Sequence, residues 1–407
     1  MGKIELLAPA KDLFKAKIAI DYGADAVYIG GKNYSLRSRA SNFTIEEIEE
    51  LVQYAHLRYA KVYVTCNIVF HNEDFIGFED YILKLDDIGV DAVIVSSFAA
   101  LKLVKKLAPH LPVHLSTQQS IINSDACNMM QIYGADRVIL GRECSINDIA
   151  SIAEKTLVPL EVFIHGGMCA NYSGRCTISS RTTNRDANRG GCAHSCRWAY
   201  ELYDGDTLKN KNKTIFSMSS KDLIGVNYIK KLMDLGVCSL KIEGRMKSEY
   251  YIAQLVKTYR NLIDEIKVDG ELSKERTLYY LAELKKAENR PCASGFFSGK
   301  CDENKTLYDE NGAGVTHEYV ALIKSYDIAT QVATIEAKNV FKKGDILEVF
   351  GPEVDNRQFF APDLVTEENE TIDTANHPTQ ILKMVIPFEV HENDMIRVID
   401  HEDWGCN

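Results

Sequence analysis

The sequence predicts an α/β protein with a (β/α)8 barrel of the TIM type, a long Cys-rich βα loop, and a small C-terminal antiparallel β-barrel domain. Over residues 1–270, short apolar runs alternate eight times with amphipathic helical stretches, the order typical of a parallel sheet closed into a barrel. The first run ends in LAPAKD and no Gly-rich dinucleotide fingerprint follows it, so an open doubly wound sheet is the weaker alternative. From about residue 316, short β-like runs are separated by Gly, Asn, Asp and Pro, as in small β-barrels.

The eight apolar runs are the predicted barrel strands, and each ends in small or polar residues. They cover residues 4–10, 24–31, 60–69, 90–97, 112–120, 135–142, 160–167 and 237–245. Between them, Thr44 with Glu47 predicts a capping box, and Ser145 stands at another expected helix start. Four glycines stand where helices are expected to end, namely Gly23, Gly89, Gly134 and Gly236.

One βα connection is much longer than the others. After the seventh run an insertion covers residues 168–216, and helical patterning resumes only from residue 221. Such loops lie on the C-terminal face of a barrel, where its active site is found, and long loops in compact domains are usually functional. The insertion holds four of the eleven cysteines and several arginines. We therefore predict that it forms the functional site.

The chain is predicted to have three parts. The barrel covers residues 1–270, a helical connector with a returning loop covers 271–310, and an acidic β-barrel domain covers 311–407. The N-terminal segment is charged and mixed, unlike a signal peptide, and no stretch is long and apolar enough to cross a bilayer. We expect a cytoplasmic protein without a membrane partner, in which disulfides are not favoured.

Charge is distributed unevenly along the chain. The net charge of -11 argues against a generic nucleic-acid binder. Residues 301–407 hold 8 Lys/Arg and 22 Asp/Glu, a net of -14, whereas residues 169–260 hold 16 Lys/Arg and 8 Asp/Glu, a net of +8. The basic stretch starts at the cysteines, so it favours an anionic partner there. A solvated, salt-bridged surface is the alternative.

Four cysteines of the insertion are candidates for one metal centre, with the spacing Cys169-x6-Cys176-x15-Cys192-x3-Cys196. Four thiolates suffice for a tetrahedral zinc ion or for an iron–sulfur cluster. The absence of a short CxxC knuckle weakens zinc, whereas ligands gathered from an irregular loop suit a cubane. Free or catalytic thiols are the third possibility. Cys238 and Cys292 lie on segments that could return to the barrel mouth, which makes them alternative ligands.

Histidines offer two further hypotheses. His165 ends the seventh strand four residues before Cys169, so it could form a Cys/His dyad, support a ligand or pack in the interior. His194, between two of the cysteines, could be a ligand. The sequence contains no HExxH and no GxSxG motif. We therefore expect neither a thermolysin-type zinc site nor a nucleophile elbow.

Arginines surround the cysteines in the sequence, namely Arg175, Arg181, Arg185, Arg189, Arg197 and Arg245. Guanidinium groups bind carboxylates and phosphates in bidentate geometry, so they indicate a polyanionic ligand, unless they form salt bridges within the loop. We expect Arg175 and Arg245 to lie innermost, because each adjoins a strand end or a cysteine. Arg185 and Arg189 lie midway along the loop and are expected at its rim.

Two strand ends carry further polar candidates. Alternation places Lys241, Glu243 and Arg245 on one face of the eighth strand, where Lys241 and Glu243 could form a structural ion pair or act in catalysis. Residues 115–120, LSTQQS, end the fifth strand with polar groups that are expected to point into the barrel mouth.

The segment EVFIHGGMCANYSGRCTIS resembles the signature of the collagenase-like peptidase U-32 family. The matching residues are Glu161, Phe163, Gly166, Cys169, Gly174, Cys176 and Ser179. Gly167 departs from the Ser or Ala that the family usually has. NRGGCAHSCRW, SSKDL and SLKIEGRMKS resemble further family blocks, so the resemblance covers most of residues 1–300, and the acidic β-domain resembles that of longer members.

The resemblance implies an iron–sulfur enzyme that installs hydroxyl groups without molecular oxygen. The chain is most similar to the branch that forms 5-hydroxyuridine at position 34 of tRNA, with prephenate, a small dicarboxylate, as the implied oxygen donor and co-substrate. A further protein of the same family is a possible partner. A collagenase-like peptidase and a zinc-containing RNA-binding module are the alternative functions.

The resemblance also assigns residues. Cys169, Cys176, Cys192 and Cys196 carry over as ligands of a 4Fe-4S cluster. Some members have a cysteine where this chain has Ile224, so Cys196 is the expected fourth ligand, with Cys238 as its alternative. The candidate catalytic residues are Arg175, Arg245, Lys241, Glu243 and His165. The candidate stacking partners of an unpaired base are Tyr172, Trp198, Phe296 and Phe297.

Overall fold

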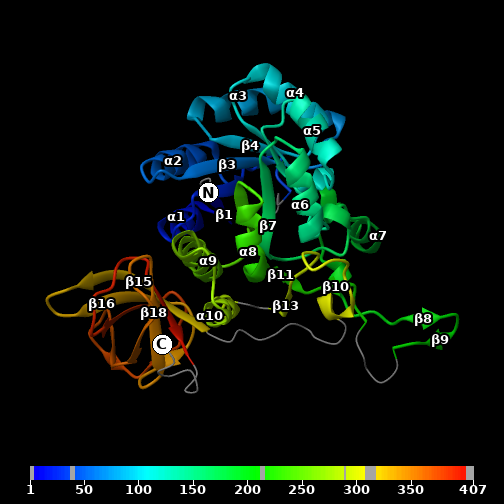
Figure 1. Cartoon of the computed structure of the whole chain (residues 1–407). Helices are drawn as coiled ribbons and strands as arrows, with labels where there is room; N and C mark the ends of the chain where they lie inside the picture. Colours follow the sequence, from blue (N-terminus) through cyan, green and yellow to red (C-terminus); the bar gives the residue numbers. More distant parts are fainter. Residues whose placement is uncertain (1–3, 37–41, 211–215, 288–289, 308–317, 400–407) are drawn as a thin grey trace.

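Eight parallel strands form the closed barrel that the sequence predicts (Figure 1). The structure is a computed structural model that describes the chain except residues 1–3, 37–41, 211–215, 288–289, 308–317 and 400–407. The barrel strands are β1 (Glu5–Pro9), β2 (Ala26–Gly30), β3 (Lys61–Cys66), β4 (Ala92–Val95), β5 (Val113–Leu115), β6 (Arg137–Ile139), β7 (Leu160–Gly166) and β12 (Ser239–Ile242). The barrel closes because β12 pairs in parallel with both β1 and β7.

Helices connect successive strands and cover the outside of the barrel. They are α1 (Leu13–Asp21), α2 (Ile45–His56), α3 (Phe78–Ile88), α4 (Phe98–Leu107), α5 (Ser124–Ile132), α6 (Ile146–Lys155), α8 (Ile229–Asp234) and α9 (Glu249–Asp269). Thr44 and Ser145 each form the N-terminal capping box of a helix. The predicted helix ends are confirmed as well, by positive φ at Gly23, Gly89, Gly134 and Gly236.

The insertion after β7 folds into short segments. They are η3 (Tyr172–Gly174), α7 (Ile178–Thr183), η4 (Ala187–Arg189), η5 (Ser195–Arg197), β8 (Tyr203–Asp204) and β9 (Thr207–Leu208). The β8–β9 hairpin extends away from the barrel (Figure 1). The helix expected from residue 221 begins only later, because β11 (Asp222–Ile224) first pairs antiparallel with the end of β7, and η6 (Val226–Tyr228) leads into α8.

The connector holds helix α10 (Lys274–Lys285) and a segment that returns to the barrel. In this segment β13 (Cys292–Ala293) pairs with β11, so the barrel sheet extends to ten strands. After η7 (Glu303–Lys305), β14 (Thr306–Leu307) pairs with β10 (Ser219–Ser220). The return therefore fixes the chain that follows the insertion against the end of β7.

The C-terminal part is an antiparallel half-barrel. Its strands are β15 (Glu318–Asp327), β16 (Val332–Ala337), β17 (Phe341–Lys342), β18 (Ile346–Phe350), β19 (Arg357–Phe360), β20 (Leu364–Thr366), β21 (Thr371–Ile372), β22 (Thr374–Ala375), β23 (Ile381–Val385) and β24 (Met395–Val398). Eight of them form one sheet in the order β19-β18-β24-β15-β16-β23-β20-β21, and β17 pairs with β22.

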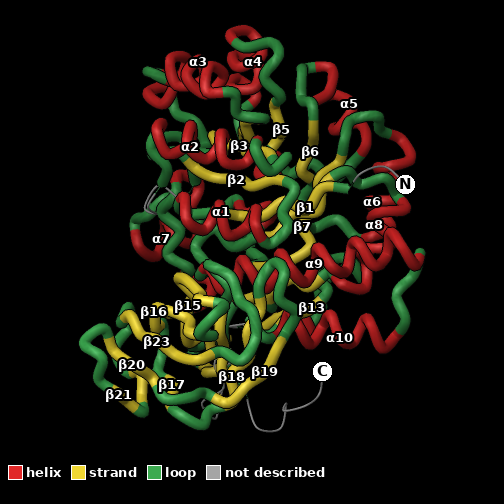
Figure 2. The backbone as a smooth tube through the Cα atoms, turned by 90° about the vertical axis from the view of Figure 1, so that its left-hand side faces the viewer, coloured by secondary structure: helices red, strands yellow, loops and turns green. Residues whose placement is uncertain are grey.

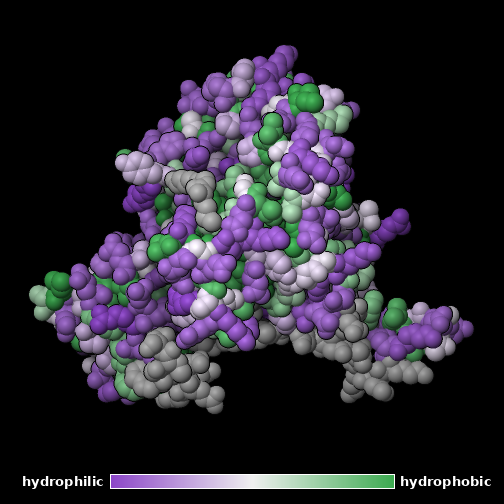
Figure 3. All heavy atoms as spheres, in the orientation of Figure 1, coloured by the Kyte–Doolittle hydropathy of each residue, from purple (hydrophilic) through white to green (hydrophobic). Residues whose placement is uncertain are grey.

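The two parts share a buried interface. Figure 2 shows the C-terminal strands beside α9 and α10, and four of their residues (Tyr319, Leu322, Phe350 and Met395) join the barrel core. The outer face seen in Figure 3 is mainly hydrophilic. Among the described residues, no helix has the length and apolar character needed to span a membrane.

Candidate functional site

A cavity of about 220 Å³ opens at the C-terminal ends of the barrel strands, between them and the insertion. Its barrel side is lined by residues of the barrel strands and of the segments that follow them, namely Tyr28, Thr65, Asn67, Ser116, Thr117, Gln118, Arg142, Phe163, Glu243 and Arg245. The polar residues after β5 therefore lie where the sequence predicts them. The insertion supplies the other wall, so the four cysteines lie at the C-terminal face of the barrel, where active sites of this fold are found.

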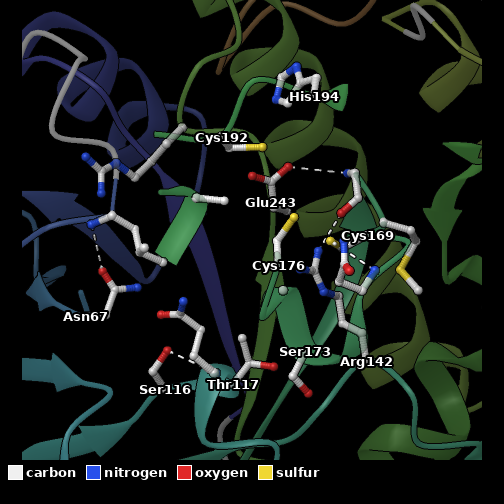
Figure 4. Close-up of a pocket in the computed structure, with 18 of the residues that line it drawn as sticks. Asn67, Ser116, Thr117, Arg142, Cys169, Ser173, Cys176, Cys192, His194 and Glu243 are labelled. Atoms are coloured by element: carbon white, nitrogen blue, oxygen red, sulfur yellow. Dashed lines mark hydrogen bonds between the residues drawn. The ribbon is translucent and has the colours of Figure 1, made fainter. Parts of the chain in front are cut away.

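All four predicted cysteines line this cavity, and none of the other cysteines among the described residues does so. Cys176 is buried, Cys169 and Cys196 are half-buried, and Cys192 is exposed. Figure 4 shows the sulfur atoms of Cys169, Cys176 and Cys192 directed toward a shared space. Burial and the neighbouring Cys169, Cys192 and Cys176 thiols raise the pKa of Cys196, while Arg197 lowers it.

Local backbone contacts hold the cysteines in place. Gly166 has a φ of 106°, and a Cβ there would collide with the Glu243 carbonyl, so the turn from β7 into the insertion requires glycine. The Asn188 side chain accepts from the Cys176 backbone N–H (3.0 Å) and donates to its carbonyl oxygen (2.9 Å). The backbone N–H of Asn171 donates to Cys169 Sγ at 3.4 Å. These contacts fix the loop around the thiols.

The four thiols are a donor set that both a zinc ion and a 4Fe-4S cluster accept. In the described part of the chain, no group of three or more His, Cys, Asp or Glu side chains is arranged to hold a metal ion. A zinc ion needs its ligands within about 2.0–2.3 Å of one point, whereas four thiolates bind a 4Fe-4S cluster through four separate iron atoms. A 4Fe-4S cluster therefore requires less convergence of the four thiols than a zinc ion does.

Neither alternative cysteine lies at the cavity. Cys238 precedes β12, at the opposite end of the barrel from the cavity, and its Sγ donates to the Leu160 carbonyl at 3.1 Å. The expectation that Cys238 could replace Cys196 as a ligand is therefore wrong for this arrangement. Cys292 lies in β13, and its Sγ contacts the Arg290 carbonyl at 3.8 Å.

Three guanidinium groups line the cavity, and they only partly match the expected set. Arg245 lies there as expected, 4% exposed, donating to Ser35 Oγ (2.7 Å), Thr65 Oγ1 (3.1 Å) and Asn42 Oδ1 (2.8 Å). Arg142 and Arg197 are the others. Arg142 donates to the Gly167 carbonyl and lies 4.9 Å from the Phe163 ring centroid. Arg142 follows the sixth strand as Arg245 follows the eighth, a signal that could have identified it.

Arg175 does not line the cavity, contrary to expectation. Its side chain is exposed, and its Nε donates to the Gln118 carbonyl at 2.7 Å. This bond turns the guanidinium toward the backbone after β5. Arg185 and Arg189 also lie outside the cavity lining, in agreement with a place at the rim. Arg189 pairs with Asp74 (2.8 Å from Nη2 to Oδ1) and donates to the Val69 carbonyl (2.9 Å).

Lys241 and Glu243 are separated by the end of β12. Lys241 is buried inside the barrel, where its Nζ lies 2.7 Å from Glu161 Oε1, so the ion pair with Glu243, one of two alternatives predicted for these residues, is not formed. The alternation fails because β12 ends at Ile242. Burial lowers the pKa of Lys241, although the Glu161 carboxylate opposes this effect. Glu243 lines the cavity and accepts from the Gly167 N–H at 3.3 Å.

His165 faces away from the cavity and packs in the interior, one of the three possibilities for this residue, so it forms no dyad with a cysteine. The register of β7 against β12 shifts here, with Phe163 opposite Lys241 but His165 opposite Ile242. This bulge adds one residue to β7 and turns His165 toward α9, where its Nδ1 lies 3.1 Å from Tyr259 Oη. Burial, with a smaller effect of Lys247, lowers the pKa of His165 to about 3.

The aromatic candidates separate into two groups. Tyr172 and Trp198 are half exposed, at 50% and 43%. Phe297 is buried against Tyr228, with ring centroids 5.0 Å apart, so a base does not stack on it in this arrangement. Phe296 is partly buried and packs against the core. Tyr28 and Phe163 line the cavity and were not predicted, because both look like ordinary strand residues in the sequence.

Comparisons with known proteins agree with this architecture. The family model "Peptidase family U32" matches residues 11–307, and "Peptidase family U32 C-terminal domain" matches residues 315–397. The chain is 44% identical over 403 residues to tRNA hydroxylation protein P1 of Bacillus subtilis, covering 97% of this chain and 94% of the relative. It is 38% identical to tRNA hydroxylation protein P of Helicobacter pylori, covering 73% and 72%. It is also 38% identical to the 23S rRNA 5-hydroxycytidine C2501 synthase of Escherichia coli, covering 65% and 40%.

Proposed function

The chain belongs to peptidase family U32, and from this we propose that it is an iron–sulfur enzyme that hydroxylates tRNA at the wobble uridine. The observation that carries the proposal is that four cysteines and three arginines share one cavity at the C-terminal face of the barrel. The names of relatives that hydroxylate tRNA and synthesise 5-hydroxycytidine in rRNA support an RNA substrate. The product of the proposed reaction is 5-hydroxyuridine at position 34 of the tRNA.

Cys169, Cys176, Cys192 and Cys196 would hold a 4Fe-4S cluster. When bound, the cluster would supply the electron-transfer chemistry that hydroxylation without molecular oxygen requires. The rest of the site binds and positions. Arg142, Arg197 and Arg245 would hold the carboxylates of a small dicarboxylate, with prephenate as the oxygen donor.

Glu243 is the one carboxylate in the described lining of the cavity. Transfer of a hydroxyl group from the donor to C5 of a uracil oxidises the base by two electrons: the donor is reduced as its C–O bond breaks, the C5–O bond forms, and the hydrogen at C5 leaves as a proton. A carboxylate held by the Gly167 N–H beside the cysteines is placed to accept it. Tyr28 and Phe163 give the cavity apolar surfaces against which a flat ring can pack.

The RNA backbone would contact the basic stretch around the insertion. Within the insertion, residues 168–216 carry 8 Lys/Arg and 4 Asp/Glu, an excess suited to phosphate contacts. The exposed rings of Tyr172 and Trp198 are available for stacking with unpaired anticodon bases. The peptidase alternative loses its proposed dyad, because His165 does not reach the cavity.

Two measurements test the proposal. Expression of the chain in cells that lack wobble-uridine hydroxylation should restore 5-hydroxyuridine in digested tRNA, measured by mass spectrometry. Protein purified without oxygen should be brown and contain iron and sulfide. A colourless zinc protein, or an apoprotein that cleaves peptides and forms no hydroxyuridine, would contradict the proposal.

A further inference from the structure

Two amide side chains of the cavity each have a buried polar atom without a hydrogen-bond partner among the described residues. They are Oε1 of Gln118 and Nδ2 of Asn171. Buried polar atoms are normally paired, because an unpaired one loses its bonds to water without replacement. Two such atoms in one cavity indicate a ligand that offers both a donor and an acceptor.

The protein holds both amides in defined positions. Gln118 lies in η2 (Thr117–Gln119) and is 5% exposed. Its backbone carbonyl oxygen accepts from Arg175 Nε at 2.7 Å. Asn171 precedes η3 and is fixed by its backbone bond to Cys169 Sγ. The η2 and η3 segments contact each other, so strand β5 and the insertion present their amides from adjoining walls.

We propose that Gln118 and Asn171 bind the target pyrimidine through its Watson–Crick edge, an inference that rests on the proposed function. Gln118 Oε1 would accept from N3–H of the uracil, and Asn171 Nδ2 would donate to O4. Carboxylate groups offer only acceptors, so a carboxylate could pair with Asn171 Nδ2 and would leave Gln118 Oε1 unpaired. A uracil satisfies both atoms with neighbouring groups.

This contact also orients the base for the reaction. A uracil held by N3 and O4 turns its N1–C6 edge, which carries the ribose, away from the two amides and leaves C5 beside O4, free of contact with them. In Figure 4, Ser116, Thr117 and Ser173 lie on one side of the cavity, and Cys192 and Glu243 lie on the other. A base anchored at the η2 and η3 side would therefore keep C5 within the cavity that the cysteines and the carboxylate also line.

Binding to a stem–loop RNA tests the inference without requiring turnover. The iron-loaded protein should bind an RNA with uridine at the target position more tightly than one with 3-methyluridine, which lacks the N3 proton, by roughly tenfold. Gln118→Ala should reduce this ratio to near one, whereas Gln118→Glu, which keeps an acceptor, should retain it. Gln119→Ala is the matched control, because Gln119 lies in the same turn but donates to the Ser96 carbonyl.

For Asn171, the comparison is between uridine and an abasic target position. Asn171→Ala and Asn171→Asp should each lower the uridine preference several-fold while the iron content stays unchanged. Unchanged ratios in folded, iron-loaded variants would overturn the inference, as would a rise only in the KM for the dicarboxylate. A wild-type protein that shows the preferences but forms no hydroxyuridine would support the amide contacts and contradict the proposed function.

Discussion

The ammonium of Lys241 lies 2.7 Å from a carboxylate oxygen of Glu161 in the closed interior of the barrel. Glu161 also pairs with Arg137 at 3.0 Å, and Arg137 pairs with Glu5 at 2.7 Å. The Lys241 Nζ is 4.3 Å from the ring centroid of Tyr28, whose side chain lines the cavity. The charged network therefore supports the cavity from inside the barrel, and we expect its role to be structural.

Lys241→Ala should lower the free energy of unfolding by about 3–5 kcal/mol, because it leaves a buried carboxylate with one fewer partner. Urea unfolding of the purified variant measures this change. Lys230→Ala, which removes a surface pair with Asp234, should stay within about 0.5 kcal/mol of the wild type. A Lys241 variant of wild-type stability without hydroxylation would instead place the ammonium in the reaction.

Replacing any one of Cys169, Cys176, Cys192 and Cys196 by Ala should remove most of the bound iron, because the four thiols surround one cavity. Iron and sulfide analysis of anaerobically purified protein measures the loss. Cys238→Ala is the sharpest control, since this thiol is bonded to the Leu160 carbonyl and not to the cavity. Full iron content after loss of Cys196 would require another fourth ligand.

The barrel could be predicted because its signals are local. Apolar runs, the Thr44 capping box and the helix-ending glycines each depend on neighbouring residues, and the structure confirms them. The cysteine cavity could be predicted because four distinctive residues follow one strand. Positions that depend on the register between strands distant in the sequence could not be predicted. The bulge that turns His165 toward α9 arises from pairing with β12, and β13 is only two residues long.

Arg142→Gln and Arg245→Gln should each weaken binding of the dicarboxylate donor about ten- to a hundredfold, because a hydrogen bond to a charged group contributes about 1.5–3 kcal/mol. Titration calorimetry with iron-loaded protein measures the affinity. Arg181→Gln, an exposed change in the same insertion, should leave it unchanged. If both inner variants keep the cluster and normal hydroxyuridine levels, the donor binds elsewhere.

Arg189 should affect the RNA and not the donor. Its guanidinium pairs with Asp74 outside the cavity lining. Arg189→Gln should weaken tRNA binding modestly and reduce its salt dependence, since phosphate contacts release counterions. Binding measured over a series of salt concentrations gives the salt dependence of the affinity. An unchanged salt dependence would show that Arg189 pairs with Asp74 and does not contact RNA phosphates.

His165 should make the protein sensitive to mild acid. Its pKa is about 3 in the folded chain and about 6.5 when unfolded, so the unfolded state binds an additional proton between these values. Stability is therefore full above pH 6.5 and declines as the pH falls toward 3, by about 2 kcal/mol between pH 7.5 and pH 5. His165→Gln should remove that part of the decline in guanidinium unfolding experiments. His377→Gln, at an exposed histidine, should leave the decline unchanged. Equal declines in the wild type and both variants would show that His165 does not cause the loss of stability.

The C-terminal half-barrel should unfold together with the barrel. Arg397 is fully buried, pairs with Glu348 of its own sheet, and donates to Gln254 Oε1 of α9 at 2.7 Å. Burial raises the pKa of Glu348, but Arg397 and Lys286 outweigh it and lower this pKa to about 2, so the interface carries a fixed charge pair.

Arg397→Ala leaves Glu348 with less compensation and should lower the free energy of unfolding by about 3–5 kcal/mol in a single unfolding transition of the whole chain. Lys343→Ala, at an exposed pair with Asp363, should cost at most about 1 kcal/mol. Calorimetry of the wild type could instead show two separate transitions, of which Arg397→Ala shifts only that of the half-barrel. This result would show that the half-barrel is an independent unit.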